Sequence, residues 1–372
     1  MINNQTVTKV LDILSQEVLE TQERRLLSMA LAPSATQEEL DSFLQGWDIE
    51  QAPIHSVILL AGLMKAHPEL SFPDSVLPRL KGVLTYCRFQ SLKLYAHFAK
   101  IATGLKDHQI PFVLLKGGAM KALRPELPRW MGDIDILVKE QDFHEAEKMA
   151  SGMGYSPFRC SHSSDLRING TQESVVDLHR FIQMNTGKET DFNASLFSRS
   201  SSGRLMSTEC LIPCPEDMAF ISLVNLYRNL CDKTSTGSVL NTFTDLHYLL
   251  ARQGFSWEIL KENARVTGTE IQLRLAAAFV SNLLPDAFPE DFLADWAERK
   301  EAVRHCIDLM YQREIISPRR AEIGEFNLHK ALKDGRNLGG YVKQRAVFFF
   351  LKRVPGIAAR TRILQKNGIV IK

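Results

Sequence analysis

The first part of the chain places apolar residues at the three- and four-residue intervals of amphipathic helices. The first such set is Val10, Leu11, Leu14, Val18 and Leu19. Thr36 is followed by Glu39 and then by another apolar set, which is the pattern of a capping box with Thr36 at the N-cap. Similar spacing over 55–66 and 83–105 predicts two further helices. The loop predicted between them contains Pro68, Pro73 and Pro78. We therefore expect residues 1–104 to form an N-terminal helical region.

The pattern changes at Ile110, where short apolar runs typical of buried strands replace the helical spacing. Strands are predicted over 111–115 and 133–138, and a glycine turn with a short helix over 119–123 separates them. Asp142 is placed as the N-cap of a helix that runs to about residue 153. The last elements predicted are strands over 166–169 and 174–181, joined as a β-hairpin by Gly170-Thr-Gln-Glu173. We expect a small mixed-sheet core over 105–214.

Helical spacing returns at Pro215-Glu-Asp217, whose acidic residues suit the positive end of a helix dipole. Ser256 is the expected N-cap of a later helix. The helices are predicted over 219–230, 240–253, 257–266, 270–284 and 290–311. The whole pattern predicts an α+β protein, in which a mixed-sheet core is followed by a C-terminal bundle over 215–334 and a basic tail over 335–372.

The composition agrees with a globular protein: of 372 residues, 45% are hydrophobic and 24% charged, with a formal net charge of +2. The six cysteines are dispersed and include no Cys-x-x-Cys pair, which favours reduced thiols over a zinc site. The first residues lack a basic patch followed by an apolar run, and the apolar stretch 346–351 is far too short to span a bilayer. We therefore expect a cytoplasmic location.

Three aspartates in the predicted core suggest a metal site. Asp133 and Asp135 are two positions apart in one predicted strand, so both carboxylates lie on the same face and repel each other unless a cation lies between them. Asp177 lies in a strand that could run beside the first. Three converging carboxylates suit two Mg²⁺ or Mn²⁺ ions, which would stabilise both oxygens of an in-line displacement at phosphorus. We predict all three aspartates as metal ligands and catalytic residues, with Asp177 or, less favoured, His179 as the general base.

The glycines after the first predicted strand suggest a phosphate site. Gly117 and Gly118 let the backbone approach a phosphate closely, and the helix that follows would point N–H groups at it. Lys116 and Arg129 could add positive charge to departing pyrophosphate. Each feature alone is explained by a tight turn, a polar strand or a solvated charge. Their order along the chain favours one nucleotide-binding site that contains all four residues.

The same residues carry a resemblance to a known family. The motifs are Leu115-Lys116-Gly117, Arg129-Trp-Met-Gly132-Asp133-Ile-Asp135-Ile-Leu-Val138, Asp177-Leu178-His179, Pro215-Glu-Asp217, Thr244-Asp245-Leu246-His247 and Trp257. Over residues 85–285 they resemble the bacterial uncharacterised nucleotidyltransferases of the polymerase-β-like superfamily. The resemblance implies an enzyme that moves a nucleoside monophosphate from a nucleoside triphosphate (NTP) to an acceptor hydroxyl and releases pyrophosphate.

The resemblance also implies roles for individual residues. Asp133 and Asp135 would bind both of two ions, Asp177 would bind one, and Gly117 would belong to the nucleotide-binding turn. Many members of the superfamily have Gly-Ser where this chain has Gly117-Gly118, so the serine hydroxyl is missing and Lys116 could replace its contact to phosphate. The superfamily modifies sugars, antibiotic-like small molecules, protein side chains and RNA ends, so the resemblance leaves the acceptor open.

The sequence is also compatible with two other functions. One is a protein that binds nucleotides without catalysis, although the complete set of three aspartates argues against it. The other uses the tail, where eight Lys or Arg residues from Lys343 onward flank Phe348-Phe-Phe-Leu351. This segment could pack on the bundle as an amphipathic helix, or contact an anionic membrane surface or nucleic acid.

Overall fold

The computed structural model describes residues 5–184, 186–232, 236–294 and 300–316. Their contacts divide them into two compact units. One unit contains the residues up to Glu20, Asn225–Val239 and the residues from Ile271 onward, and the other contains Thr21–Val224 and Leu240–Glu270. The four-part division predicted from the sequence stays a prediction. The basic tail and its expected membrane or nucleic-acid contacts lie outside the described residues.

The larger unit opens with helices, as expected for the N-terminal region as a whole, although no separate helix was predicted over Thr21–Leu31. They are α2 (Thr21–Leu31), α3 (Gln37–Gln45), α4 (Ile54–Ala66) and α5 (Leu77–Asp107). The predicted capping box at α3 is confirmed, because Thr36 accepts from the Glu39 N–H while the Glu39 side chain accepts from the Thr36 N–H. Pro78 was wrongly assigned to a loop. It lies in the first turn of α5, where a missing N–H leaves no helical hydrogen bond unmade.

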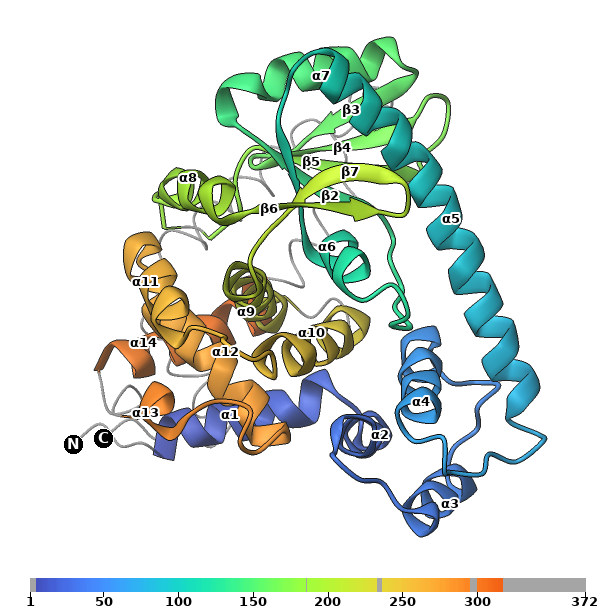
Figure 1. Ribbon diagram of the computed structural model, residues 1–372. Coiled ribbons are helices and arrows are strands. Elements are labelled where there is room, and N and C mark those ends of the chain that lie inside the picture. Colours follow the sequence, from blue (N-terminus) through green and yellow to red (C-terminus); the bar gives the residue numbers. More distant parts are fainter. Residues whose placement is uncertain (1–4, 185, 233–235, 295–299, 317–372) are drawn as a thin grey trace, which may run out of the picture. The chain divides into compact units, whose positions relative to one another are not determined.

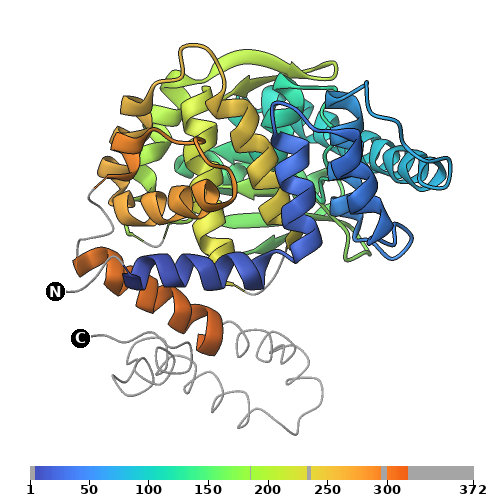
Figure 2. The ribbon, with the colours of Figure 1, turned by 90° about the horizontal axis from the view of Figure 1, so that it is seen from below.

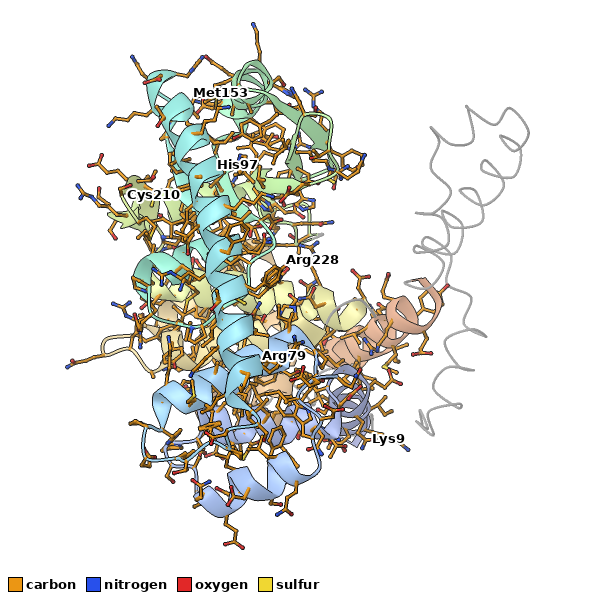
Figure 3. The ribbon with its side chains drawn as sticks, turned by 90° about the vertical axis from the view of Figure 1, so that its right-hand side faces the viewer. Lys9, Arg79, His97, Met153, Cys210 and Arg228 are labelled. Carbon is orange, nitrogen blue, oxygen red and sulfur yellow. The ribbon has the colours of Figure 1, made fainter. Side chains whose placement is uncertain are left out.

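Helix α5 spans 31 residues and runs alongside the sheet (Figure 1). Figure 3 shows it along its length, with Arg79 near its start and His97 further on. The His97 Nδ1 atom lies 2.9 Å from the Tyr155 hydroxyl, which links the helix to the strand that begins at Tyr155. Phe98 packs edge-on against Phe112 with 5.9 Å between ring centroids. The helix therefore contacts both the edge strand that begins at Tyr155 and the interior strand of the sheet that begins at Phe112.

The core is a mixed sheet of seven strands in the order β3-β4-β5-β2-β1-β7-β6. The strands are β1 (Phe112–Leu114), β2 (Ile134–Val138), β3 (Tyr155–Arg159), β4 (Ser163–Ile168), β5 (Ser174–His179), β6 (Ser201–Leu205) and β7 (Thr208–Ile212). β2 is antiparallel to β1 and parallel to β5. All five residues of β2 are buried, because it lies near the middle of the sheet. The α+β class predicted from the sequence is therefore confirmed.

The hairpin predicted between 166 and 181 is confirmed as β4 and β5, with Gly170 in the turn at a φ of +78°. The α-helix predicted after the second strand is also present, as α7 (Phe143–Gly152). The prediction that Asp142 caps the N-terminus of this helix was wrong, however. A 3₁₀ turn (Glu140–Asp142) precedes α7, so Asp142 has helical backbone angles and, in the described part of the chain, makes no side-chain capping bond.

Four more helices contribute wholly or partly to this unit. They are α8 (Glu189–Arg199), α9 (Pro215–Cys231), α10 (Thr236–Leu250) and α11 (Trp257–Thr267). The predicted N-cap of α11 is confirmed, since the Ser256 hydroxyl accepts from the Ile259 N–H at 3.4 Å. A buried carboxylate links three of these helices: Asp217 accepts from Arg199 at 2.6 Å and from Asn263 at 2.8 Å.

The smaller unit contains α1 (Gln5–Val18), α12 (Glu270–Leu283), α13 (Glu290–Leu293) and α14 (Lys300–Tyr311), which a single π-helical turn (Gln312–Ile316) extends. Figure 2 shows α1 beside α14, and Arg313 donates to Glu17 at 2.9 Å between these segments. The single helix predicted over 290–311 was wrong, because α13 ends at Leu293 and Ala294 is extended. None of the helices in the described residues combines the length and apolar character needed to cross a bilayer.

Candidate active site

The site forms where β1 meets α6 (Lys116–Leu123). The Leu115 N–H donates to the Asp135 carbonyl at 2.9 Å, which fixes the end of β1 against β2. α6 then begins at Lys116, whose φ of +44° is in the left-handed region and costs a non-glycine residue about 1 kcal/mol. Gly117 and Gly118 therefore lie in the first turn of the helix. The sequence prediction of a glycine turn before a helix at 119 was wrong in this respect.

Close packing explains why both positions are glycine. A Cβ atom at Gly118 would lie 2.7 Å from Cδ1 of Leu114, closer than real Cβ contacts allow. A Cβ atom at Gly117 would lie 3.1 Å from both Arg129 Nε and Met131 Cγ. A serine at 118 would meet the same obstruction, so its absence follows from the approach of α6 to β1. Binding of phosphate by these two glycines stays a prediction.

Two of the three predicted aspartates are register partners on adjacent strands. β2 pairs with β5 in parallel, and Asp135 lies directly opposite Asp177. Directly opposite residues project from the same face of a sheet, so the two carboxylates converge. Asp133 precedes β2 by one residue and is half-buried. On its other side, β5 places Asp177 opposite Asp165 of β4, but the Asp165 carboxylate accepts from Arg167 at 2.9 Å.

Two basic side chains lie within this carboxylate group. Lys116 Nζ forms an ion pair with Oδ1 of Asp135. His179 Nε2 lies 2.9 Å from the same Asp135 oxygen and 3.0 Å from Oδ2 of Asp177. Within the described residues Asp133 has no ion pair. The group thus contains three carboxylates and two basic groups, which leaves negative charge for a further cation to balance.

The pKa values of these groups follow from burial and from the ion pairs. Burial and then the neighbouring Asp135 carboxylate raise the pKa of Asp133 to about 7. Burial has the same effect on Asp135, but Lys116 and His179 outweigh it and hold the pKa of Asp135 below its ordinary value. His179 likewise outweighs burial at Asp177 and lowers that pKa. In return, the carboxylates overcome the effect of burial and raise the pKa of Lys116 and of His179.

Arg129 reaches the start of α6 from the loop before β2. Its Nη1 donates to Asp245 of α10 at 3.0 Å, and both side chains are largely buried. Its Nε is buried and has no hydrogen-bond partner among the described residues. Asp245 belongs to a motif that the family resemblance includes, but sequence reasoning assigned it no role. In the structure, Asp245 accepts a hydrogen bond from Arg129 and holds it beside Gly117.

His162 is a second residue that the sequence did not identify. It lies between β3 and β4, and one ring nitrogen can approach a nitrogen of His179 and an oxygen of Asp177, with all three atoms within 4.8 Å of one another. This is a set of side chains that could hold a metal ion. Ser161-His162-Ser163 has no pattern that marks a ligand, so no local signal could have found it.

A cavity of about 540 Å³ lies in the same unit beside α5. Its lining combines apolar residues of α5, such as Leu84 and Leu92, with the basic side chains of Lys65, Lys121 and Arg129. Arg129 thus contacts this cavity as well as the start of α6.

A comparison with protein families places the chain among the α+β nucleotidyltransferases, which are transferases. The model of the family described as "Uncharacterised nucleotidyltransferase" matches residues 55–285, more than half of the chain. The chain therefore belongs to this family, and the resemblance noted from its motifs is confirmed. A search of curated proteins gave no match.

Solved structures similar to this chain share little sequence with it. The antibiotic-resistance factor ANT(2'')-Ia has 13% identity, with 53% of this chain and 94% of that chain covered and a TM-score of 0.29. An antigenic nucleotidyltransferase-like protein from Paracoccidioides brasiliensis has 14% identity, 54% and 91% coverage and a TM-score of 0.31. TM-scores this low give no basis for transferring residues or substrates to this chain.

Proposed function

We propose that this transferase moves a nucleoside monophosphate from an NTP to an acceptor hydroxyl, with pyrophosphate as the leaving group. In this proposal Asp133, Asp135 and Asp177 hold two divalent cations, Mg²⁺ or Mn²⁺. The observation that carries it is the register of β2 and β5, which sets Asp135 opposite Asp177 on one face of the sheet. Asp133, two residues before Asp135, is close enough to interact electrostatically with Asp135 and Asp177, so three carboxylates meet at one place.

The residues present fit such cations. Oδ1 of Asp177 is buried and has no hydrogen-bond partner among the described residues, although buried carboxylate oxygens normally find one. Asp133 has no ion pair in the described part of the chain, and burial and then the neighbouring Asp135 carboxylate raise its pKa. Carboxylate oxygens are the ligands these ions prefer. When bound, such ions neutralise charge on the attacking and leaving oxygens at phosphorus.

The chain's own groups would bind and orient the triphosphate. The first helical hydrogen bond of α6 runs from the Ala119 N–H to the Leu115 carbonyl at 3.1 Å. The N–H groups before Ala119 therefore lie at the positive end of the helix, which favours phosphate. Lys116 also lies at this end and would add a charged donor, while its contact with Asp135 orients that carboxylate.

Arg129 is suited to a second phosphate contact. Its Nη1 is held by Asp245, whereas its Nε has no partner among the described residues and lies beside Gly117. A phosphate oxygen at this point would satisfy a buried donor that otherwise costs about 1–3 kcal/mol. The Arg129–Asp245 pair would thus orient the guanidinium toward the nucleotide.

Proton transfer from the acceptor hydroxyl needs a base near the aspartates. Asp177 remains the base expected from the sequence, with His179 less favoured, and its Oδ2, which lies 3.0 Å from His179 Nε2, is the oxygen left for this role when Oδ1 binds a cation. His179 contacts two carboxylates and would keep both in position. The identity of the acceptor, a cytoplasmic location and a contact of the basic tail with an anionic surface all remain predictions from the sequence.

The test measures metal-dependent NTP binding and pyrophosphate release by full-length protein with Mg²⁺ or Mn²⁺. Asp133→Asn and Asp135→Asn should each lower pyrophosphate release by about 100-fold or more, since each removes a charge that balances the ions. They should also remove the increase in NTP affinity that the metal provides. Asp165→Asn is the matched control, because this aspartate neighbours Asp177 but is paired with Arg167.

Nucleotide binding can be measured without knowing the acceptor. Titration calorimetry with each NTP, with and without Mg²⁺, separates nucleotide binding from turnover. Unchanged metal-dependent binding and unchanged pyrophosphate release in both variants would show that the aspartates are not the ligands. Metal-dependent binding without turnover for any acceptor class would favour the non-catalytic alternative.

A further inference from the structure

We propose that His162, Asp177 and His179 form a site for a divalent transition-metal ion such as Mn²⁺, Co²⁺ or Zn²⁺. The inference rests on the proposed function, because it assigns the class of one of the two ions expected there. Asp177 would bind this ion through one oxygen and remain part of the carboxylate group. The other ion would keep the all-oxygen ligands Asp133 and Asp135.

These side chains come from two segments, β5 and the turn between β3 and β4. His179 is the last residue of β5 and pairs in register with Ser163 of β4, directly after His162. The Arg180 N–H donates to the His162 carbonyl at 3.0 Å, which holds the turn between β3 and β4 next to the end of β5. The two imidazole rings are 5.6 Å apart between centroids. The sheet register therefore places His162 beside His179, although 17 positions separate them in the sequence.

The distances suit a site that closes around an ion. One ligand atom from each residue lies within 4.8 Å of the other two. Bonds of about 2.1 Å to a tetrahedral ion would bring such atoms to about 3.4 Å from one another. His162 lies in a turn rather than in a strand and is half-exposed, so it can make this adjustment. Asp177 and His179 are fixed by β5.

Unsatisfied atoms support the presence of a ligand. His179 is 3% exposed, its Nε2 faces oxygens of Asp135 and Asp177, and its Nδ1 has no hydrogen-bond partner among the described residues. Oδ1 of Asp177 is also buried and has no hydrogen-bond partner among the described residues. Metal-bound histidines commonly donate their other ring N–H to a carboxylate, which orients the ring. Asp135 can fill this role for His179.

The ligand chemistry defines the class of ion. Imidazole nitrogen suits Zn²⁺, Co²⁺ and other first-row transition ions, whereas Mg²⁺ prefers an octahedron of oxygen ligands and water. Two imidazoles and one carboxylate should therefore discriminate against Mg²⁺. A site built from Asp133 and Asp135 alone would lack this preference.

The test titrates EDTA-treated, full-length protein with Co²⁺ and records its visible absorption, then measures Zn²⁺ affinity by competition with a chromophoric chelator. Wild-type protein should show ligand-field bands of nitrogen-ligated Co²⁺. His162→Ala should lose these bands and bind Zn²⁺ about tenfold or more weakly. His144→Ala is the matched control, because it removes a histidine of α7 that is 74% exposed.

His162→Ala should keep the fold, since the side chain is half-exposed in a turn, and circular dichroism checks this. Identical Co²⁺ spectra and Zn²⁺ affinities for wild type and His162→Ala would overturn the inference. If metal-dependent NTP binding is nevertheless lost in Asp133→Asn, the proposed function stands without it. Conversely, Co²⁺ bands that depend on His162, in a protein whose NTP binding is independent of Asp133, would support the metal site and contradict the proposed function.

Discussion

At the scale of single residues, Gly118 shows how packing determines a sequence position that looks functional. Gly118→Ala should destabilise the protein by about 1–3 kcal/mol, because its Cβ would be forced to 2.7 Å from the buried Leu114 side chain. The helix propensity of alanine would offset about 1 kcal/mol of the cost. Urea or thermal unfolding of the full chain measures the difference.

A second glycine provides the control. Gly62 is also helical, in α4, but a Cβ there would meet nothing within 4 Å, so Gly62→Ala should stabilise by about 0.5–1 kcal/mol. Leu114→Val removes the obstructing Cδ1 atom, and Gly118→Ala should cost less in that background. Equal effects of Gly118→Ala and Gly62→Ala would mean that the close packing of α6 on β1 does not exist.

At the scale of elements, Thr36 and Asp142 look alike in the sequence but differ in the structure. Thr36→Ala should cost about 1 kcal/mol, because it removes the capping box of α3. Asp142→Ala should cost less than about 0.5 kcal/mol, through the helix dipole alone. The 3₁₀ turn before α7 leaves the Asp142 side chain without a capping bond in the described residues.

The two free energies of unfolding are compared in the same buffer at low ionic strength. Added salt should shrink the small Asp142 effect, because the helix dipole is screened, and leave the Thr36 effect nearly unchanged. A cost for Asp142→Ala as large as that for Thr36→Ala would contradict the assignment.

The sequence predicted those elements whose signals are local. The helices of the first hundred residues, the β4–β5 hairpin and the Ser256 cap follow from apolar spacing, turn residues and capping side chains. β6 was not predicted, because Ser-Ser-Gly-Arg-Leu has little strand propensity and forms by pairing with β7. β7 in turn lies beside β1, nearly a hundred residues earlier in the chain. Such pairing is non-local, so the order of the strands could not be read from the sequence.

The same distinction applies to the site. Asp133 and Asp135 were found because a strand places alternate residues on one face, and the predicted approach of Asp177 agrees with the register of β5. Their role as metal ligands stays a prediction. His162 and Asp245 were missed because each reaches the site through tertiary contacts: His162 through the β3–β4 turn, and Asp245 through its pair with Arg129.

At the scale of the whole molecule, a net charge of +2 gives little overall repulsion near neutral pH, so a few buried groups should dominate the pH dependence of stability. Asp245 is one of them. Burial raises its pKa to about 7, and the neighbouring Arg129 opposes that shift without cancelling it. The unfolded chain releases this proton near pH 4, so folding takes up a proton between about pH 4 and pH 7.

The sign of the effect follows from this uptake. Stability contributed by protonated Asp245 is present at low pH and is lost as the pH rises through about 7, by at most about 4 kcal/mol. Asp245→Asn removes the titration and keeps a polar partner for Arg129. The wild-type Tm should therefore fall relative to the Asp245→Asn Tm between pH 4.5 and pH 8, as measured by thermal unfolding. A constant difference across this range would show that Asp245 is ionised throughout, and Arg129 would then outweigh the burial of the pair.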